Sequence, residues 1–234
     1  MTLVGRFKSV RKRLRALWRR EVYARLSTQQ AFERIYATQH WGASEDGFCS
    51  GRGSSDVYTR GYVEVIRDFI VQREVRQVVD LGCGDFRVGR QLLAPGLTYT
   101  GVDIVRPLVE RNQLRFGAPN VSFVVRDMVR EALPDGELAL LRQVLQHLSN
   151  QQILQVLANC RRYRYLVVTE HLPIEGAVTP NLDKPHGPDI RLQDRSGVFL
   201  ELPPFNCKTE VLTETAIGPG EVLRTVLITN SAPP

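Results

Sequence analysis

The stretch VVDLGCGDFRVG, residues 78–89, decides the fold expected of this chain. A hydrophobic run ends in the acid Asp80 and a glycine-rich turn follows, which is typical of a strand that feeds a nucleotide-binding loop. The glycines stand at positions 82, 84 and 89. The dinucleotide fingerprint G-x-G-x-x-G would need the third glycine at 87, where this chain has Arg87. The turn therefore predicts a nucleotide-type site that departs from the dinucleotide pattern.

Strand and helix patterns alternate from residue 75 onward. We expect strands in RQVVDL, TYTGVDI, VSFVVRD, ELALLR and YRYLVVTE, and helices over Val88–Leu93, over Pro107–Phe116 and after the N-cap candidate Ser149. In the tail, KTEVLTETA and EVLRTVLITN flank Gly218-Pro219-Gly220, which is a hairpin pattern. The pattern predicts an α/β fold: a Rossmann-like, doubly wound seven-stranded sheet, mostly parallel with a C-terminal antiparallel hairpin, plus an N-terminal helical extension.

The net charge of +6 belongs to the N-terminus. Residues 1–25 hold nine Arg or Lys and one acid, so residues 26–234 carry about −2. A body that grips a duplex would be expected to have a basic face of its own, so nucleic acid is disfavoured as a partner. The four cysteines show no C-x-x-C spacing, and no apolar run has the length of a secretory signal core or a membrane span. We therefore expect a cytoplasmic protein.

Apolar residues recur at three- and four-residue steps through residues 1–26, with Arg and Lys between them, which predicts an amphipathic basic helix. One interpretation is peripheral docking on an anionic membrane through residues 1–25, with Phe7 and Trp18 entering the interface. The other is a helix that packs its apolar stripe on the body; an RNA contact and a transit peptide are further alternatives. We expect this helix and a loop that covers the predicted nucleotide-type site to occupy residues 1–58, and the main α/β domain to occupy residues 59–234.

Three successive strands of the predicted sheet end in acids, and ligands of such sheets sit at these ends. Asp80 precedes the glycine turn, Asp103 suits the two hydroxyls of a ribose, and Asp127 with Met128 suits an adenine. No Lys or Arg within the turn would face a pyrophosphate, and no P-loop is present. The pattern predicts a nucleoside with a positive charge rather than one with phosphates.

These motifs resemble the class I S-adenosylmethionine-dependent methyltransferases. VVDLGCGDFRVG is close to that family's glycine motif, and YTGVDI, VSFVVRDM and LALLRQVLQHL fall where its later motifs lie. HWGASEDGFCSGRGSSDVY, residues 40–58, resembles the pre-core segment of bacterial methyltransferases associated with sugars and cell-surface glycans; a plain connecting loop is the alternative. The resemblance implies S-adenosylmethionine as cofactor, with Arg52 on its methionine carboxylate. The cofactor residues it implies are Arg52, Gly53, Asp80, Gly82, Cys83, Gly84, Asp103, Ile104, Asp127, Met128, Arg142 and Gln143.

The methyl acceptor is narrowed by exclusion. LRQV follows the fourth strand where enzymes that methylate amino groups of nucleic acids carry Asn/Asp-Pro-Pro-aromatic, and no Pro-Cys pair for cytosine chemistry is present. We therefore expect O-methylation of a sugar or glycan. The alternatives are another small metabolite, a protein or RNA as acceptor, or a non-catalytic cofactor-binding module. The oligomeric state is left open.

A hydroxyl acceptor needs a base, and histidine is the natural one near neutral pH. The catalytic candidates are His147, after the fourth strand, and His171, directly after the fifth, together with its neighbour Glu170. His147 has a packing interpretation and His171 could instead cap a turn; His186 is a further histidine candidate. The Pro- and Gly-rich segment 172–205 predicts a lid that binds the acceptor, in which we assign substrate binding to His186, Asp189 and Arg191. A divalent metal such as Mg²⁺ on Asp183, Asp189 or Glu170 is an alternative that no spacing establishes.

Overall fold

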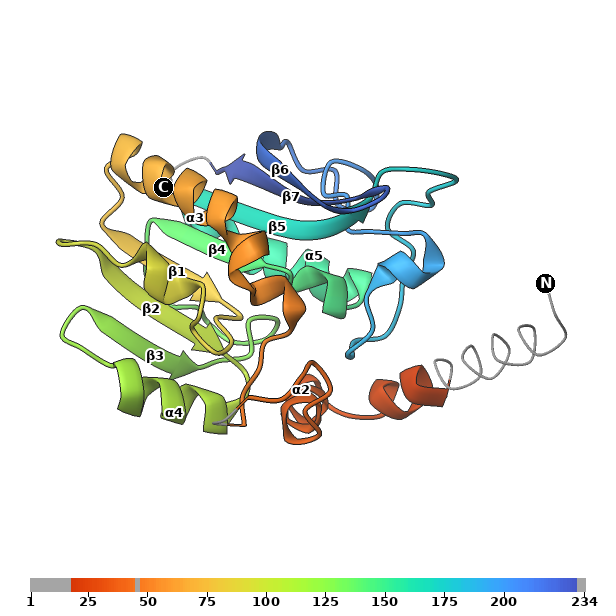
Figure 1. Ribbon diagram of the computed structural model, residues 1–234, viewed down its shortest axis with the longest axis horizontal. Coiled ribbons are helices and arrows are strands. Elements are labelled where there is room, and N and C mark those ends of the chain that lie inside the picture. The colour runs from red at the N-terminus through yellow and green to blue at the C-terminus, as the bar shows by residue number, and fades with distance from the viewer. Residues whose placement is uncertain (1–17, 45–46, 231–234) are drawn as a thin grey trace, which may run out of the picture.

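The computed structural model describes residues 18–44 and 47–230. Its strands form one seven-stranded sheet in the order β3-β2-β1-β4-β5-β7-β6 (Figure 1). The strands are β1 (Gln77–Leu81), β2 (Thr98–Asp103), β3 (Val121–Val125), β4 (Leu138–Arg142), β5 (Tyr165–Pro173), β6 (Glu210–Gly218) and β7 (Glu221–Thr229). β7 pairs antiparallel with β5 and β6, and the other pairings are parallel. The predicted fold class is confirmed.

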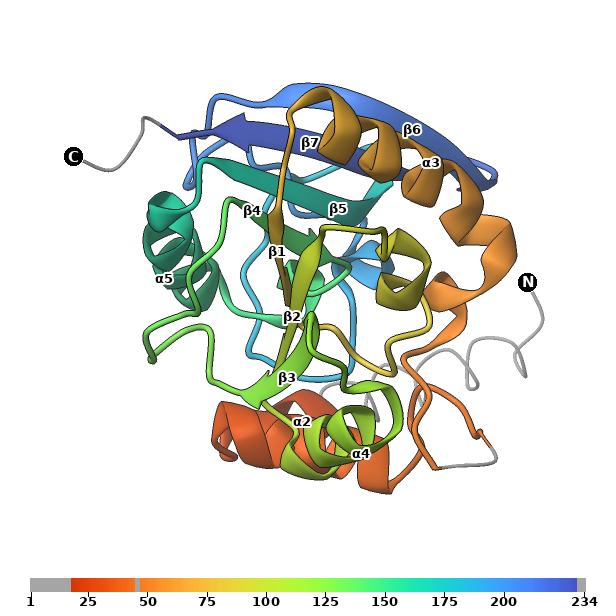
Figure 2. The same cartoon turned by 90° about the vertical axis from the view of Figure 1, so that its left-hand side faces the viewer.

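Helices lie on both faces of this sheet (Figure 2). α3 and α4 pack against one face and α5 against the other. The helices are α2 (Thr28–Ala37), α3 (Asp56–Gln72), α4 (Arg106–Phe116) and α5 (Asn150–Asn159), with short 3-10 turns η1 (Arg52–Ser54), η2 (Gly89–Leu92), η3 (Leu145–His147), η4 (Cys160–Arg162) and η5 (Arg191–Asp194). Residues 18–24 are also helical and precede α2.

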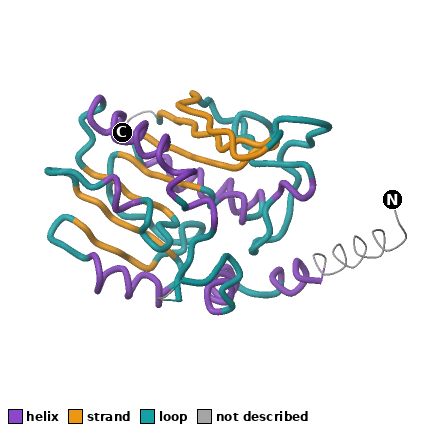
Figure 3. Tube along the Cα trace, viewed as in Figure 1, coloured by secondary structure: helices purple, strands orange, loops and turns teal. Residues whose placement is uncertain are grey.

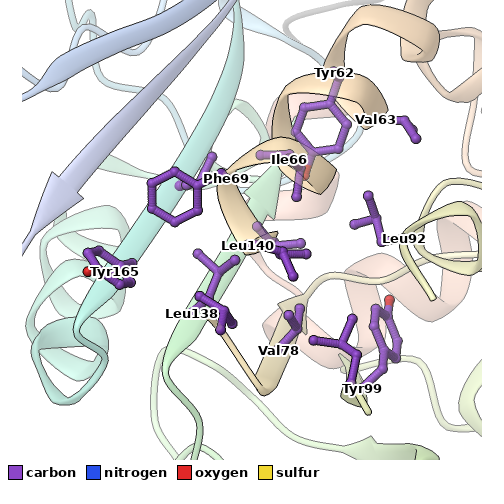
Figure 4. Packing of buried hydrophobic residues seen from close by; sticks show 14 of the residues in the cluster. Tyr62, Val63, Ile66, Phe69, Val78, Leu92, Tyr99, Leu138, Leu140 and Tyr165 are labelled. Atoms are coloured by element: carbon purple, nitrogen blue, oxygen red, sulfur yellow. The ribbon is translucent and has the colours of Figure 1, made fainter. Parts of the chain in front are cut away.

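The core consists of two main apolar clusters, one on each face of the sheet. Side chains alternate along a strand, so in β4 Leu138 and Leu140 join the cluster under α3, whereas Ala139 and Leu141 join the one under α5. Figure 4 shows the first cluster, where α3 side chains such as Ile66 meet those of the central strands. Because both faces are covered, the central strands are continuous hydrophobic runs.

Two predicted elements differ from the structure. The helix expected over Val88–Leu93 is the single turn η2, Gly89–Leu92. Gly89 packs tightly there, since an added Cβ would come within 2.2 Å of the Tyr99 hydroxyl. The fifth strand runs on to Pro173, because β7 pairs with β5 along its whole length. His171 therefore lies within β5 rather than after it.

The N-cap predicted for the helix after the fourth strand is confirmed. Ser149 caps α5 through a capping box with Gln152, as its position predicts. Between β5 and β6 the chain is mostly loop, with η5 as its helical turn within the described residues (Figure 3). The predicted boundary after residue 58 falls in the first turn of α3.

Candidate active site

A cavity of about 600 Å³ lies at the carboxyl ends of the parallel strands, a size typical of small-molecule sites. Its wall combines the glycine turn after β1, the ends of β2 to β5, and the segment that precedes α3. All twelve residues that the sequence assigns to the cofactor line it: Arg52, Gly53, Asp80, Gly82, Cys83, Gly84, Asp103, Ile104, Asp127, Met128, Arg142 and Gln143. The fold thus brings together residues that are up to 91 positions apart in the chain.

The glycine turn needs glycine for two physical reasons. Gly82 and Gly84 have φ angles of +78° and +55°, which other residues rarely adopt. A Cβ on Gly84 would lie 2.2 Å from the Ser50 hydroxyl, because the covering segment sits directly on the turn. Ser50 and Asp85 hold this contact from both sides: the Asp85 N–H donates to the Ser50 hydroxyl, and the Ser50 N–H donates to the Asp85 carboxylate. The space at the turn therefore suits a bound ligand but has no room for a side chain at position 84.

Asp80 of β1 and Arg142 of β4 are charged residues of the cavity wall. The Tyr99 hydroxyl donates to the Asp80 carboxylate, and burial raises the pKa of that carboxyl to about 6, with Tyr99 opposing the rise. Arg142 donates from Nη2 to the carbonyls of Gly53 and Tyr58, and its Nε has no partner among the described residues. The Asp80 carboxylate fits the ammonium of an amino-acid tail, and the Arg142 guanidinium fits its carboxylate.

Asp103 and Asp127 stand where the ribose and the adenine are expected. The Asp103 carboxylate accepts the N–H groups of Gly84 and Val105, which aims it across the cavity. Each of its oxygens keeps a second lone pair for a hydroxyl of the ligand. Asp127 accepts the Val129 N–H, and the buried Met128 lines the cavity beside it. These acceptor oxygens and the apolar Met128 fit an adenine nucleoside.

Aromatic side chains that were not predicted from the sequence also line the cavity, among them Tyr36 and Trp41. Tyr36 donates or accepts a hydrogen bond with the Ser50 hydroxyl, and its ring packs against Trp41. Trp41 lies 4.9 Å from the ring of His147. Arg52 lines the cavity but is exposed, and it donates to the Tyr58 hydroxyl. Trp41 belongs to the predicted covering loop, and its aromatic character was the available signal.

His147 lines the cavity but is poorly suited to removing a proton. Its Nδ1 contacts the Gly187 carbonyl at 3.1 Å. Burial, and then the charge of Lys184, lowers the pKa of the imidazole to about 3. A group that holds a proton this weakly is a weak base near neutral pH.

His171 lines the same cavity and has a carboxylate partner. Its Nε2 lies 3.0 Å from Oε2 of Glu221, the first residue of β7. Burial lowers the pKa of His171, and Glu221 opposes this effect. The carboxylate holds the proton on Nε2, so Nδ1 keeps the lone pair of a base. Glu170 is the neighbour of His171 in the sequence, but in the structure the carboxylate that contacts the imidazole belongs to Glu221.

Glu170 does not line the cavity, which corrects its predicted catalytic role. It is buried, and its two oxygens accept the N–H groups of Leu145 and Gln146. Its side chain follows the strand alternation to the face opposite His171. Burial raises the pKa of Glu170 to about 8, against the two N–H groups that lower it.

Two of the three residues assigned to the acceptor also lie outside the cavity wall. Arg191 is 2% exposed and donates to the carbonyls of Leu145, Gln146, Leu148 and Leu182. His186 contacts the Leu26 carbonyl and the Gln152 amide. Asp189 does line the cavity, where Arg19 holds it in an ion pair.

The acids named as metal ligands are not gathered in one place. Asp183 accepts the N–H of Asn150, Asp189 pairs with Arg19, and Glu170 accepts two N–H groups elsewhere. In residues 18–44 and 47–230, no group of three or more His, Cys, Asp or Glu is arranged to hold a metal.

The part of the basic segment that the structure describes begins at Trp18, which is 68% exposed. Arg19 and Arg20 form ion pairs with Asp189 and Asp194 of the predicted lid. Phe7 and the rest of residues 1–17 lie outside the described residues. Over the described part of the chain, no helix is long and apolar enough to span a bilayer.

Comparison with known proteins agrees with this geometry. A family described as "Methyltransferase domain" matches residues 78–164, and no curated protein matches the sequence. The fold is similar to N-methyltransferase NodS from Bradyrhizobium japonicum WM9 in complex with S-adenosyl-l-homocysteine (TM-score 0.61, 15% identity, 87% of this chain and 98% of that one). It is also similar to magnesium protoporphyrin IX methyltransferase from Synechocystis PCC 6803 with bound SAM (0.54, 16%, 88% and 98%). A third is the N-terminal domain of EvdMO1 in the presence of SAH and D-fucose (0.52, 15%, 88% and 98%). Residues 78–164 thus match a methyltransferase domain, and the chain shares its fold with the three proteins named above.

Proposed function

We propose that this chain, a methyltransferase of the class I fold, transfers the methyl group of S-adenosylmethionine to a hydroxyl of a sugar or glycan. One observation carries the proposal. Twelve residues implied by the resemblance, from separate parts of the chain, line one cavity that also holds the His171–Glu221 pair. The similar structures named above include an N-methyltransferase and a porphyrin methyltransferase, so the choice of a hydroxyl rests on this chain's own residues.

The donor supplies an already activated methyl group on a sulfonium. The protein has to hold the acceptor in line with it and remove the hydroxyl proton. His171 takes that proton at Nδ1, and Glu221 stabilises the imidazolium that forms because its carboxylate already holds Nε2. Asp80 and Arg142 hold the amino-acid tail of the donor, and Asp103 holds its ribose.

The remaining wall suits a hydroxyl-rich acceptor. Gln146, Asp189 and Gln193 offer amide and carboxylate groups that hydrogen-bond to hydroxyls, and Trp41 offers an apolar ring face. Gln193 and Asp189 belong to the predicted lid, so the lid contributes to the same cavity.

Two measurements test the proposal. Titration calorimetry with S-adenosylhomocysteine should show binding, and a cofactor pocket without affinity for it would refute the assignment. Methyl transfer from labelled S-adenosylmethionine should then be screened over methyl glycosides, lipid-linked glycans, small metabolites, protein and RNA, with and without Mg²⁺. Transfer to RNA or protein with none to any glycoside would overturn the sugar assignment.

We also propose peripheral contact with an anionic membrane through residues 1–25, supported by their nine basic residues and the exposed Trp18. Vesicles with anionic lipid should bind the intact chain, and vesicles of neutral lipid alone should not. A chain without residues 1–17 keeps Trp18, Arg19 and Arg20 and should bind much more weakly. Equal binding to both kinds of vesicle, or none, would contradict the contact.

A further inference from the structure

Gln146 carries a buried oxygen atom that lacks a partner in the cavity wall. The residue is 5% exposed and lines the cavity. Its side-chain Oε1 makes no hydrogen bond to any of the described residues. Buried polar atoms in folded proteins nearly always have a partner, and leaving one unpaired is costly. The missing partner therefore calls for an explanation.

The orientation of this amide is decided by its neighbour. Nε2 of Gln146 donates to the carbonyl of Gln143 at 3.3 Å. Turning the amide over would set two acceptor oxygens against each other and leave the nitrogen unpaired instead. The oxygen is thus the atom that needs a donor, and the partner it lacks is an O–H or N–H group.

The backbone of Gln146 is held on both its N–H and its carbonyl, which fixes where the residue sits in the cavity wall. Its N–H donates to Glu170 at 3.1 Å, and its carbonyl accepts from Arg191 at 3.2 Å and from Lys184 at 3.5 Å. Glu170 also accepts the Leu145 N–H at 2.8 Å. Glu170 and Arg191, both expected from the sequence to meet the substrate, instead hold the backbone of Gln146.

We propose that Gln146 is an acceptor-binding residue, whose Oε1 accepts a hydrogen bond from a hydroxyl of the molecule to be methylated. The proposal rests on the proposed methyl transfer. The acceptor is favoured over the donor because Lys184 and Arg191, which hold Gln146, both belong to the predicted lid. In the proposed function the polar groups of the donor are assigned to other residues of the cavity wall, Asp80, Asp103 and Asp127.

The variant Gln146→Met tests this, since it keeps the length of the side chain and removes the unpaired oxygen. The melting temperature of the ligand-free protein should rise by about 2–6 °C, because removing a buried atom without a partner outweighs the loss of the 3.3 Å hydrogen bond from Nε2 to the Gln143 carbonyl. The Kd for S-adenosylhomocysteine should change by less than about twofold. The kcat/KM for whichever methyl glycoside the wild type methylates should fall by about 10- to 100-fold.

A matched control is Gln113→Met. The Oε1 of Gln113 accepts the Phe123 N–H at 2.9 Å and lies away from the cavity, so this variant should lower the melting temperature and leave transfer unchanged. Gln146→Leu serves as a second apolar variant if Gln146→Met does not fold.

Three results would overturn the proposal: a melting temperature that falls in both Gln146 variants, a tenfold loss of S-adenosylhomocysteine affinity, or unchanged kcat/KM. Failure of the wild type to bind S-adenosylhomocysteine would refute the proposed function itself. The melting temperatures do not depend on that binding, so the two failures can be told apart.

Discussion

Replacing Asp103 by alanine should damage donor binding and stability by separate amounts that the structure lets us work out. The carboxylate is 7% exposed and accepts the N–H groups of Gly84 and Val105. Alanine leaves both N–H groups without a partner, at about 1–3 kcal/mol each. For a chain of this length, the resulting loss of about 2–6 kcal/mol should lower the melting temperature by about 4–24 °C.

The affinity loss follows from the ligand side. A hydrogen bond from a ribose hydroxyl to a carboxylate contributes about 1.5–3 kcal/mol, so each one lost weakens binding by about 10- to 150-fold. Asp103→Asn keeps one good acceptor oxygen and should lose less on both counts. Titration calorimetry with S-adenosylhomocysteine, together with differential scanning calorimetry of the ligand-free protein, measures the two effects.

The control for Asp103→Ala is Asp135→Ala. Asp135 is an exposed acid that pairs with Arg162 and does not line the cavity. This variant should leave donor affinity unchanged. If Asp103→Ala binds S-adenosylhomocysteine as tightly as the wild type, or no more weakly than Asp135→Ala does, the ribose assignment is wrong.

Four further outcomes are expected. His171→Ala should lose about 10²- to 10⁴-fold in turnover with donor affinity intact, whereas His147→Ala should keep most turnover; the reverse order in steady-state kinetics would reject His171 as the base. Donor affinity should rise with pH through about 6, because the cationic tail needs the ionised carboxylate of Asp80, whose pKa is about 6; calorimetry of Asp80→Asn should give a flat profile. The raised pKa of Asp80 also makes the stability of the fold depend on pH. The stability that Asp80 contributes is full below about pH 3.8 and is lost as the pH rises through about 6. Wild-type melting temperatures that lack this fall over the same pH range would contradict the burial of Asp80. Gly84→Ala should weaken S-adenosylhomocysteine binding at least tenfold, because its φ is +55° and a Cβ there would meet Ser50; unchanged binding would show that the turn can relax.

Three acids of the cavity wall could be predicted from sequence because they lie at or just after the ends of strands. Asp80 and Asp103 lie at the ends of β1 and β2, Asp127 follows β3 by two residues, and parallel strands bring such ends to one edge of the sheet. Once the alternation of strands and helices is recognised, their convergence follows from topology alone. Each of the three lines the cavity.

The acceptor half could not be predicted in the same way. Glu170 and His171 are neighbours in the chain, yet one holds the backbone of Leu145 and Gln146 while the other lines the cavity. Side chains alternate along a strand, but which face meets the cavity depends on what packs on each side. Two residues of the lid differ in the same way. Arg191 is buried and donates to backbone carbonyls, whereas Asp189 lines the cavity.

By itself the sequence determined the sheet, the glycine turn and the acids at the strand ends, since each follows from local pattern and from the rule that parallel strands end together. Only the tertiary structure decided the partner of His171. That partner is Glu221, 50 residues further on, and the antiparallel register of β5 with β7 sets it beside the histidine. Register between distant strands is a property of non-local pairing and packing, so no local pattern carries it.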